Sequence, residues 1–347
     1  MTNEIEGLKV SLELVADKFQ QGLSQVTQSC QKATGDISNS LKTLQQGLEL
    51  FVGGYVIKQL ANLVTSFDDM RVKVSVATGD IGAKFERTSQ LMDQIMKNTD
   101  LSVKEISDFM ITLRNTMGLT NQEIEKQYKM WEAWMDITGK GPEVLAQTDK
   151  ALRAMGITTD EAKKQFLDFA IVIQRTTPLS LDSLLNTLGQ AGPLFRALGM
   201  NVQQATAFLG MLANAGVDAE NTTRALSYAI GKIKSPAELN ALIDRIKTAS
   251  TDFEAAHMAA EVFGQKAGAK LGPALRSGAK DMETLTKALE EGTGAFDDAA
   301  KVIEESVSEQ LGQLKNQFNI IADDLLKKLL PNIKIIVGAF DNMSEGS

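Results

Sequence analysis

The segment Gly199-Met200-Asn201-Val202-Gln203-Gln204 shows the pattern that decides the fold of this chain. A glycine is followed by an apolar residue, then by a residue that can cap a helix, and three positions later by a polar residue. The same order occurs at residues 118–123, 156–161 and 216–221. In the last of these copies the closing residue is Asn221, which is a weaker partner than Glu or Gln.

Each position in this pattern has a role at a corner between two helices. Glycine adopts the left-handed conformation that ends a helix, and the apolar residue after it can pack back on that helix. The next residue accepts a hydrogen bond from an N–H group in the first turn of the following helix. The closing Glu or Gln can bond back to the cap residue. The predicted cap residues are Thr120, Thr158, Asn201 and Asp218.

Further helix starts lack the glycine. They are Ser102 with Glu105, Ser180 with Ser183, Ser235 followed by Pro236, and Thr251 with Glu254. Together these signals predict helices near 102–117, 120–137, 143–154, 158–175, 180–197, 201–214, 218–232, 236–249 and 252–264. The sequence has no convincing β alternation, so we expect an all-α fold in which short helices with tight glycine corners form a compact bundle.

The two ends of the chain show longer helical patterns. Apolar residues from Ile5 to Val26 recur in steps of three and four, which is typical of a coiled coil. The pattern resumes in a shifted frame after Gly35. Near the other end, an apolar stripe from Phe296 to Leu329 predicts one amphipathic helix of roughly 34 residues, about 50 Å long. We therefore expect an N-terminal coiled-coil-like arm at 1–64, a compact helical core at 65–280 and an acidic segment at 281–347.

The composition excludes several classes of site. Among 347 residues there is one histidine, His257, and one cysteine, Cys30. A His- or Cys-based metal site within one chain and an intrachain disulfide are therefore excluded. A net charge of −8 makes the chain a poor general binder of nucleic acid. Adjacent acids such as Asp297 and Asp298 diverge by about 100° on a helix, so they do not converge on one bond. We predict no catalytic, cofactor-binding or metal-ligating residue.

Two features leave alternatives open. Val262–Lys280 contains four cations and no acid: Lys266, Lys270, Arg276 and Lys280. A solvated helix face explains them best, and docking of a negatively charged partner is the alternative. Trp131 and Trp134 lie on one helix face, where packing in a core or an interface is expected. The longest apolar runs, 50–57 and 329–340, are shorter than the roughly 20 residues that a membrane-spanning helix needs.

Residues 180–231 resemble the core region of phage tail tape measure proteins. The resemblance rests on the order of several elements: Gly192-Pro193, Arg196-Ala197-Leu198-Gly199, Leu212-Ala213-Asn214-Ala215-Gly216 and Arg224-Ala225-Leu226. Lys234-Ser235-Pro236 and Phe263-Gly264-Gln265-Lys266-Ala267 continue it. Phe67-Asp68-Asp69-Met70 upstream, and residues 313–318 through 329–331 downstream, extend it over about 65–335.

The resemblance implies a structural protein of the virion without enzymatic activity or cofactor. Such a protein lies in the lumen of the tail tube, sets the length of the tail, scaffolds tube assembly in the host cytoplasm and leaves at infection. Its implied partners are tail-tube subunits, assembly chaperones and tail-tip or baseplate proteins, and the helical arms suggest self-association. The alternative is a membrane-perturbing helical pore or translocated effector, supported by the segment 320–340.

Overall fold

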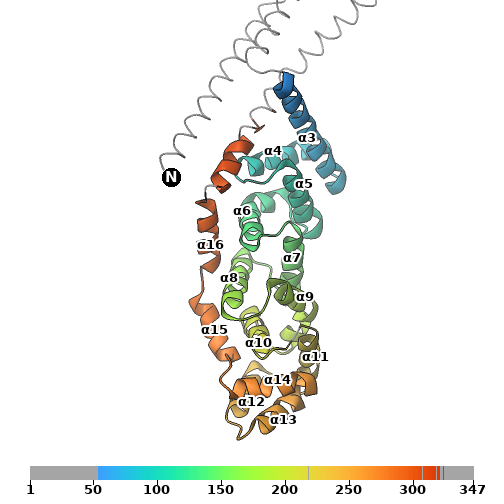
Figure 1. Ribbon diagram of the computed structural model, residues 1–347. Helices are drawn as coiled ribbons and strands as arrows, with labels where there is room; N and C mark the ends of the chain where they lie inside the picture. The colour runs from blue at the N-terminus through green and yellow to red at the C-terminus, as the bar shows by residue number, and fades with distance from the viewer. Residues whose placement is uncertain (1–53, 218, 307, 318, 321–322, 324–347) are drawn as a thin grey trace, which may run out of the picture. The chain divides into compact units, whose positions relative to one another are not determined.

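The computed structural model describes residues 54–217, 219–306, 308–317, 319–320 and 323 (Figure 1). The regular structure of these residues is helical and includes no strand, which confirms the predicted all-α class. Contacts between residues divide the chain into two compact units. The first comprises the residues up to Asn115, Leu119–Glu125 and those from Glu305 onward, and the second comprises Thr116–Gly118 and Lys126–Glu304.

The predicted three-part organisation is a different division of the chain. Most of the arm at 1–64 lies outside the described residues, as does the C-terminal end beyond Asp323. The boundaries at 64 and 280 therefore stay a prediction. None of the described helices has both the length and the apolar character needed to cross a membrane.

The first unit is built around three helices that pack on one another. They are α3 (Gly54–Thr78), α4 (Ala83–Lys97) and α5 (Val103–Ile111), with a π-helical turn at Thr112–Thr116. Their buried side chains include Phe67, Met92, Ile95, Phe109 and Met110, each no more than 1% exposed. These large apolar residues recur at helical spacing, so each helix turns one apolar face to the same core.

The second unit is a stack of short helices. Its elements are α6 (Asn121–Thr138, which begins in the first unit), α7 (Glu143–Met155), α8 (Asp160–Thr176), α9 (Leu181–Ala197), α10 (Val202–Asn214), α11 (Ala219–Ile230), α12 (Pro236–Lys247), α13 (Asp252–Phe263), α14 (Gln265–Arg276), α15 (Met282–Glu291) and α16 (Ala295–Glu304). Along the stack α7 packs on α9, α9 on α11 and α11 on α13, while α8 packs on α10 and α13 packs on α14.

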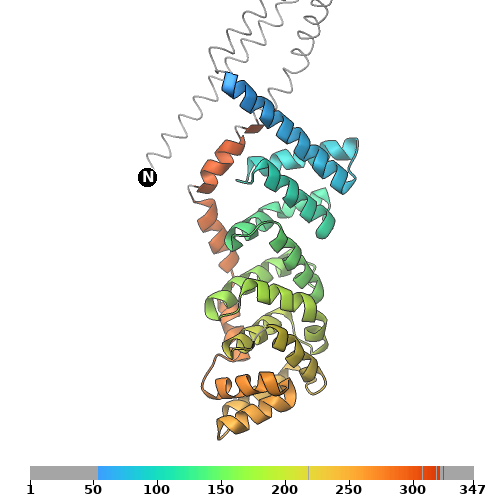
Figure 2. The same cartoon turned by 45° about the vertical axis from the view of Figure 1, so that its right-hand side comes forward.

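The last two helices of this unit run back along the stack. α15 packs on α10 and α8, and α16 packs on α8, as the views in Figures 1 and 2 show. A buried hydrogen bond holds the start of α16, because the backbone N–H of Phe296 donates to Asp168 Oδ1 at 2.8 Å. The chain therefore reverses direction after α14 and returns past helices that it formed earlier.

The glycine corners occur where the sequence predicts them. Gly118, Gly156, Gly199 and Gly216 all have positive φ, between 70° and 75°. At three corners the apolar residue after the glycine donates its N–H to a carbonyl five residues back, as in Ile157 to Leu152 at 2.8 Å. At Gly118 the bond spans six residues, because the π-helical turn adds one residue before the corner.

Most predicted caps are confirmed, with one shift. Ser102 and Asn201 form complete capping boxes with Glu105 and Gln204. The cap of α8 is Thr159, whose side chain accepts from the N–H of Ala162, and not Thr158 as predicted. Thr159 lies one position later than the pattern predicts, so the residue three positions after this cap is Ala162 and not Glu161. Asp218 lies outside the described residues.

The prediction of one continuous helix over 296–329 is wrong in its described part. α16 ends at Glu304, Glu305 lies in a turn and Ser306 in a bend, and a new helical segment runs over 308–317. Ser306 Oγ accepts a hydrogen bond from the N–H of Glu309 at 3.2 Å, so it caps that segment. Ser306-Val307-Ser308-Glu309 has the spacing of a capping box, a local signal for this break. Helices α3, α4, α14 and α15 were also missing from the prediction.

Candidate functional site

A buried ion cluster joins two distant segments of the first unit. Arg71 lies on α3 with 6% of its side chain exposed. Its Nη2 atom is 2.8 Å from Asp93 Oδ1 and 3.0 Å from Oδ2 of Asp323, whose side chain is fully buried. The guanidinium carbon also lies 5.3 Å from the centre of the Phe67 ring. Arg71 and Asp323 are 252 positions apart in the sequence.

The charges in this cluster depend on one another. Burial alone disfavours the charged form of Arg71, but its ion pairs with Asp93 and Asp323 outweigh that effect, and the pKa of Arg71 is raised above its ordinary value. The guanidinium therefore stays charged, and it presents the planar set of donors that carboxylates accept. A lysine at this position could not serve two carboxylates with the same geometry.

The C-terminal segment of the unit makes further contacts with the loop between α4 and α5. Asn316 Nδ2 donates to two buried carbonyls, those of Thr99 at 2.9 Å and Leu101 at 2.8 Å. Gln317 donates to the carbonyl of Lys97 at 3.1 Å. Because one side-chain amide satisfies two carbonyls of a loop, Asn316 replaces the backbone partners that the loop lacks.

A glycine allows this segment to approach the loop closely. A Cβ atom placed on Gly312 would lie 2.3 Å from the Cβ of Asp100, which is closer than two non-bonded carbon atoms can come. Burial, followed by the charge of Glu105, raises the pKa of Asp100. We name the set formed by Arg71, Asp93, Gly312, Asn316 and Asp323 the closure cluster. It is the candidate functional site, because it joins two segments of the first unit that lie far apart in the sequence.

A second buried polar network stabilises the corner between α3 and α4. Asp80 Oδ1 accepts from Arg114 Nη2 at 3.0 Å, and Asp80 Oδ2 accepts from the Thr88 hydroxyl at 2.7 Å. Asn121 in turn donates to the Thr88 hydroxyl at 2.9 Å. This network connects α4, the π-helical turn and the start of α6, and it belongs to the same unit as the closure cluster.

The cations of 262–280 have structural partners within the second unit. Lys270 donates to the carbonyl of Gly216 at 2.7 Å, Arg276 to that of Ala249 at 2.9 Å, and Lys280 to that of Thr176 at 3.1 Å. Each of these carbonyls lies at or just beyond the C-terminal end of a helix, where positive charge is favourable. These contacts explain three of the four cations and favour the structural interpretation over a docking site for a negative partner.

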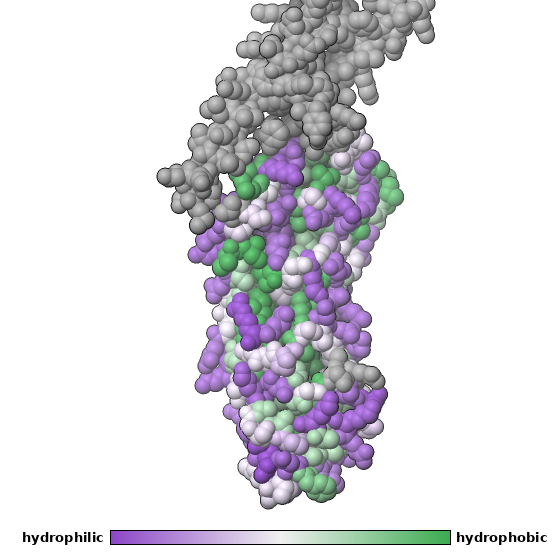
Figure 3. Space-filling model, viewed as in Figure 1, coloured by the Kyte–Doolittle hydropathy of each residue, from purple (hydrophilic) through white to green (hydrophobic). Residues whose placement is uncertain are grey.

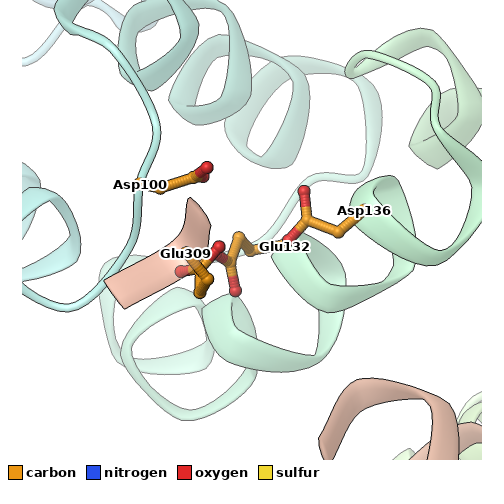
Figure 4. Close-up of side chains that lie close together, drawn as sticks. All are labelled: Asp100, Glu132, Asp136 and Glu309. Atoms are coloured by element: carbon orange, nitrogen blue, oxygen red, sulfur yellow. The ribbon is translucent and has the colours of Figure 1, made fainter. Parts of the chain in front are cut away.

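Each unit contains one pair of carboxylate side chains whose two members lie close to each other (Figure 4). In the first unit, oxygen atoms of Asp100 and Glu309 lie within 4.8 Å of each other. In the second, oxygen atoms of Glu132 and Asp136, one turn apart on α6, do the same. Two carboxylates are fewer ligands than Ca²⁺ takes, and we assign no metal to either pair.

The two tryptophans and the histidine discussed in the sequence analysis lie in different surroundings. Trp131 and Trp134 are fully buried, and their indole N–H groups donate to Gln127 and Thr148. His257 is exposed and stacks on Phe253, which is 82% exposed. Cys30 lies outside the described residues. On the face drawn in Figure 3, hydrophilic residues surround smaller apolar patches.

The motifs that carry the family resemblance are packing elements. A Cβ on Gly192 would lie 2.6 Å from the backbone of Ala154, so Gly192 marks the close crossing of α9 over α7. Gly264 forms the corner between α13 and α14. Phe67 and Met70 belong to the core of the first unit. The closure cluster was missed by sequence reasoning, because no local pattern links Arg71 to Asp323.

Comparisons with known proteins give two positive findings. The family model described as phage-related minor tail protein matches residues 84–302. A tape measure protein of Pneumococcus phage Dp-1 is 21% identical to this chain over an alignment 377 residues long. The alignment covers 99% of this chain and 32% of that protein. The chain therefore spans about a third of the length of this relative. Comparison with solved structures gave no match.

Proposed function

Because this chain belongs to the family of phage-related minor tail proteins, we propose that it is a tape measure protein, or a portion of one. The observation that carries the proposal is the likeness to a tape measure protein along 99% of the chain. In this role, the chain lies in the lumen of the tail tube and acts as a ruler, because its extended length limits how far the tube grows.

The proposed partners are the other components of a growing tail. Tube subunits assemble around the ruler, chaperones keep the chain available before assembly, and tip or baseplate proteins hold one end. The coiled-coil pattern of 1–64 supports self-association of the arm. We propose assembly in the host cytoplasm and release of the protein at infection.

The proposed mechanism is steric and uses no catalytic residue. The side chains that the fold buries together, such as those of the closure cluster, form ion pairs and hydrogen bonds that stabilise helices. The membrane-perturbing alternative receives no support from the family match. The segment 320–340 on which it depends lies almost entirely outside the described residues.

The length of the tail tests this proposal. We would insert a 28-residue helical peptide after Gly35, where the heptad frame shifts, in the phage that encodes this protein. Four whole heptads preserve the pattern on either side, and the helix adds about 42 Å. Electron microscopy should then show tails longer by that amount and unchanged in diameter.

A matched control replaces residues 8–35 with a different 28-residue heptad sequence, so that composition changes and length does not. Tails of the control phage should keep their normal length. Normal tails of unchanged length in the insertion phage would contradict the ruler role of the arm.

A further inference from the structure

The described path from Arg71 to Asp323 begins and ends at one place. The two side chains form an ion pair of 3.0 Å inside the first unit, although 251 residues separate them. Built as one straight helix, those residues would span about 380 Å. In the folded protein, the ends of this path are joined by a single salt bridge.

The closure does not depend on that pair alone. Asn316 binds the carbonyls of Thr99 and Leu101, Gln317 binds that of Lys97, and Gly312 lies directly against Asp100. Ile320 is 1% exposed, so the C-terminal segment also contributes to the apolar core. Contacts from four successive turns hold the segment on the first unit, whatever the position of the second unit.

We propose that the folded core, residues 71–323, is a side module of the ruler that adds almost nothing to the length it measures. This inference rests on the proposed ruler function. Each part of a ruler protein contributes to tail length only the distance between the points where the chain enters and leaves that part. For a part whose two ends are in contact, that distance is close to zero, however many residues lie between them.

The inference changes which residues count toward tail length. Taken as one extended helix, 296–329 would contribute its full 50 Å to the ruler. In the structure α16 packs on α8, and the helical segment 308–317 packs on the loop between α4 and α5 through Gly312 and Asn316. Residues up to Asp323 are thus part of the closed module, and the measuring part lies outside 71–323.

Insertion of the same peptide at two places tests this inference. The first phage carries the 28-residue helical peptide after Gly35, as above. The second carries it after Gly278, an exposed glycine whose surroundings are open. Exposed corners tolerate insertions well. We expect tails about 42 Å longer in the first phage and tails of normal length in the second.

Each other outcome has a distinct meaning. Tails lengthened equally by both insertions would overturn the inference and leave the ruler function standing, because the core would then be extended in the tube. Normal length in both phages would contradict the ruler role of the arm, on which this inference rests. If the insertion at Gly278 prevents tail formation, the peptide is placed after Thr293, at the exposed corner between α15 and α16. The same two expectations then apply.

A measurement on the purified full-length protein checks the closure independently of phage assembly. With Cys30 replaced by serine, spin labels at Asp69→Cys and Lys315→Cys report the distance across the closure. The closed module predicts one short, narrow distance distribution. An extended core would place the two labels about 370 Å apart, beyond the range of the method, and would overturn the inference.

Discussion

A buried arginine that holds two carboxylates stabilises a fold only while the set is intact. Replacement of Arg71 by methionine leaves the fully buried Asp323 side chain without this cation. Breaking a buried ion pair by removing one partner costs about 3 to 5 kcal/mol. We therefore expect Arg71→Met to lower the free energy of unfolding of the first unit by about that amount, measured by urea denaturation.

The double variant Arg71→Met with Asp323→Asn is the control. If the two residues act through their pair, the double variant should lose less stability than the sum of the single variants. Additive losses would contradict the coupling across 252 positions.

Asp281 gives a prediction about pH. Burial raises its pKa, but hydrogen bonds from Lys247 and from the N–H of Thr284 outweigh this effect, and the pKa of Asp281 is lowered. A carboxyl with a lowered folded-state pKa stabilises the fold above its unfolded value, near 3.9, and loses this contribution as the pH falls through the folded value. Asp281→Asn should therefore destabilise the protein at pH 7.

Thermal denaturation over a pH series measures this effect. The difference between wild type and Asp281→Asn should shrink below about pH 4. Since asparagine still caps helices, Asp281→Ala should cost about a further 1 kcal/mol through loss of the α15 cap. A difference that does not change with pH would exclude the charge as its cause.

At the scale of the element, the glycine corners set the angles between helices. Gly156 has φ of 75°, which L-residues adopt at a cost of roughly 1 to 2 kcal/mol. Gly156→Ala should destabilise the second unit by that amount, although the added Cβ meets only Arg196, at 3.5 Å. Gly231→Ala is the control, since Gly231 lacks positive φ and its added Cβ has room. Urea midpoints should separate the two variants.

The hairpin of α13 and α14 depends on a second property of glycine, its size. A Cβ on Gly268 would lie 2.2 Å from the backbone nitrogen of Ala260. Gly268→Leu should force the helices apart and cost about 3 kcal/mol or more. The neighbouring variant Ala269→Leu places the same side chain on an exposed position and should be close to neutral. Equal melting temperatures would contradict the close packing.

Local signals made the elements predictable from sequence, whereas their arrangement required the structure. Caps such as Ser102 and Asn201 and the glycine corners act within six residues, so the predicted helices from 102 to 264 end close to the observed ends. Where two signals competed, the prediction failed: the apolar stripe after Phe296 hid the helix cap at Ser306. Neither kind of signal reports that Asp323 meets Arg71, because that contact depends on every corner between them.

At the scale of the whole molecule, the two units should differ in their dependence on chain length. Residues 116–304 include every residue of the second unit. We expect this fragment to unfold cooperatively on its own, as measured by circular dichroism in urea. Residues 54–125 lack the closing segment and should not. A fragment 54–125 as stable as the intact first unit would contradict the role of the closure cluster.

The return of the chain from Asp323 to Arg71 also sets the order of events on the ribosome. Helices α3 to α5 leave the ribosome before the helices of the second unit, but Asp323 is made 252 residues after Arg71. At 5 to 20 residues per second, that delay is roughly 13 to 50 s. During this time the second unit can complete its own core, while Arg71 still lacks Asp323 and the carbonyls of Thr99 and Leu101 still lack Asn316. The first unit thus stays incomplete on the nascent chain until synthesis has passed Asp323, and that interval is when a holding chaperone would have most to bind.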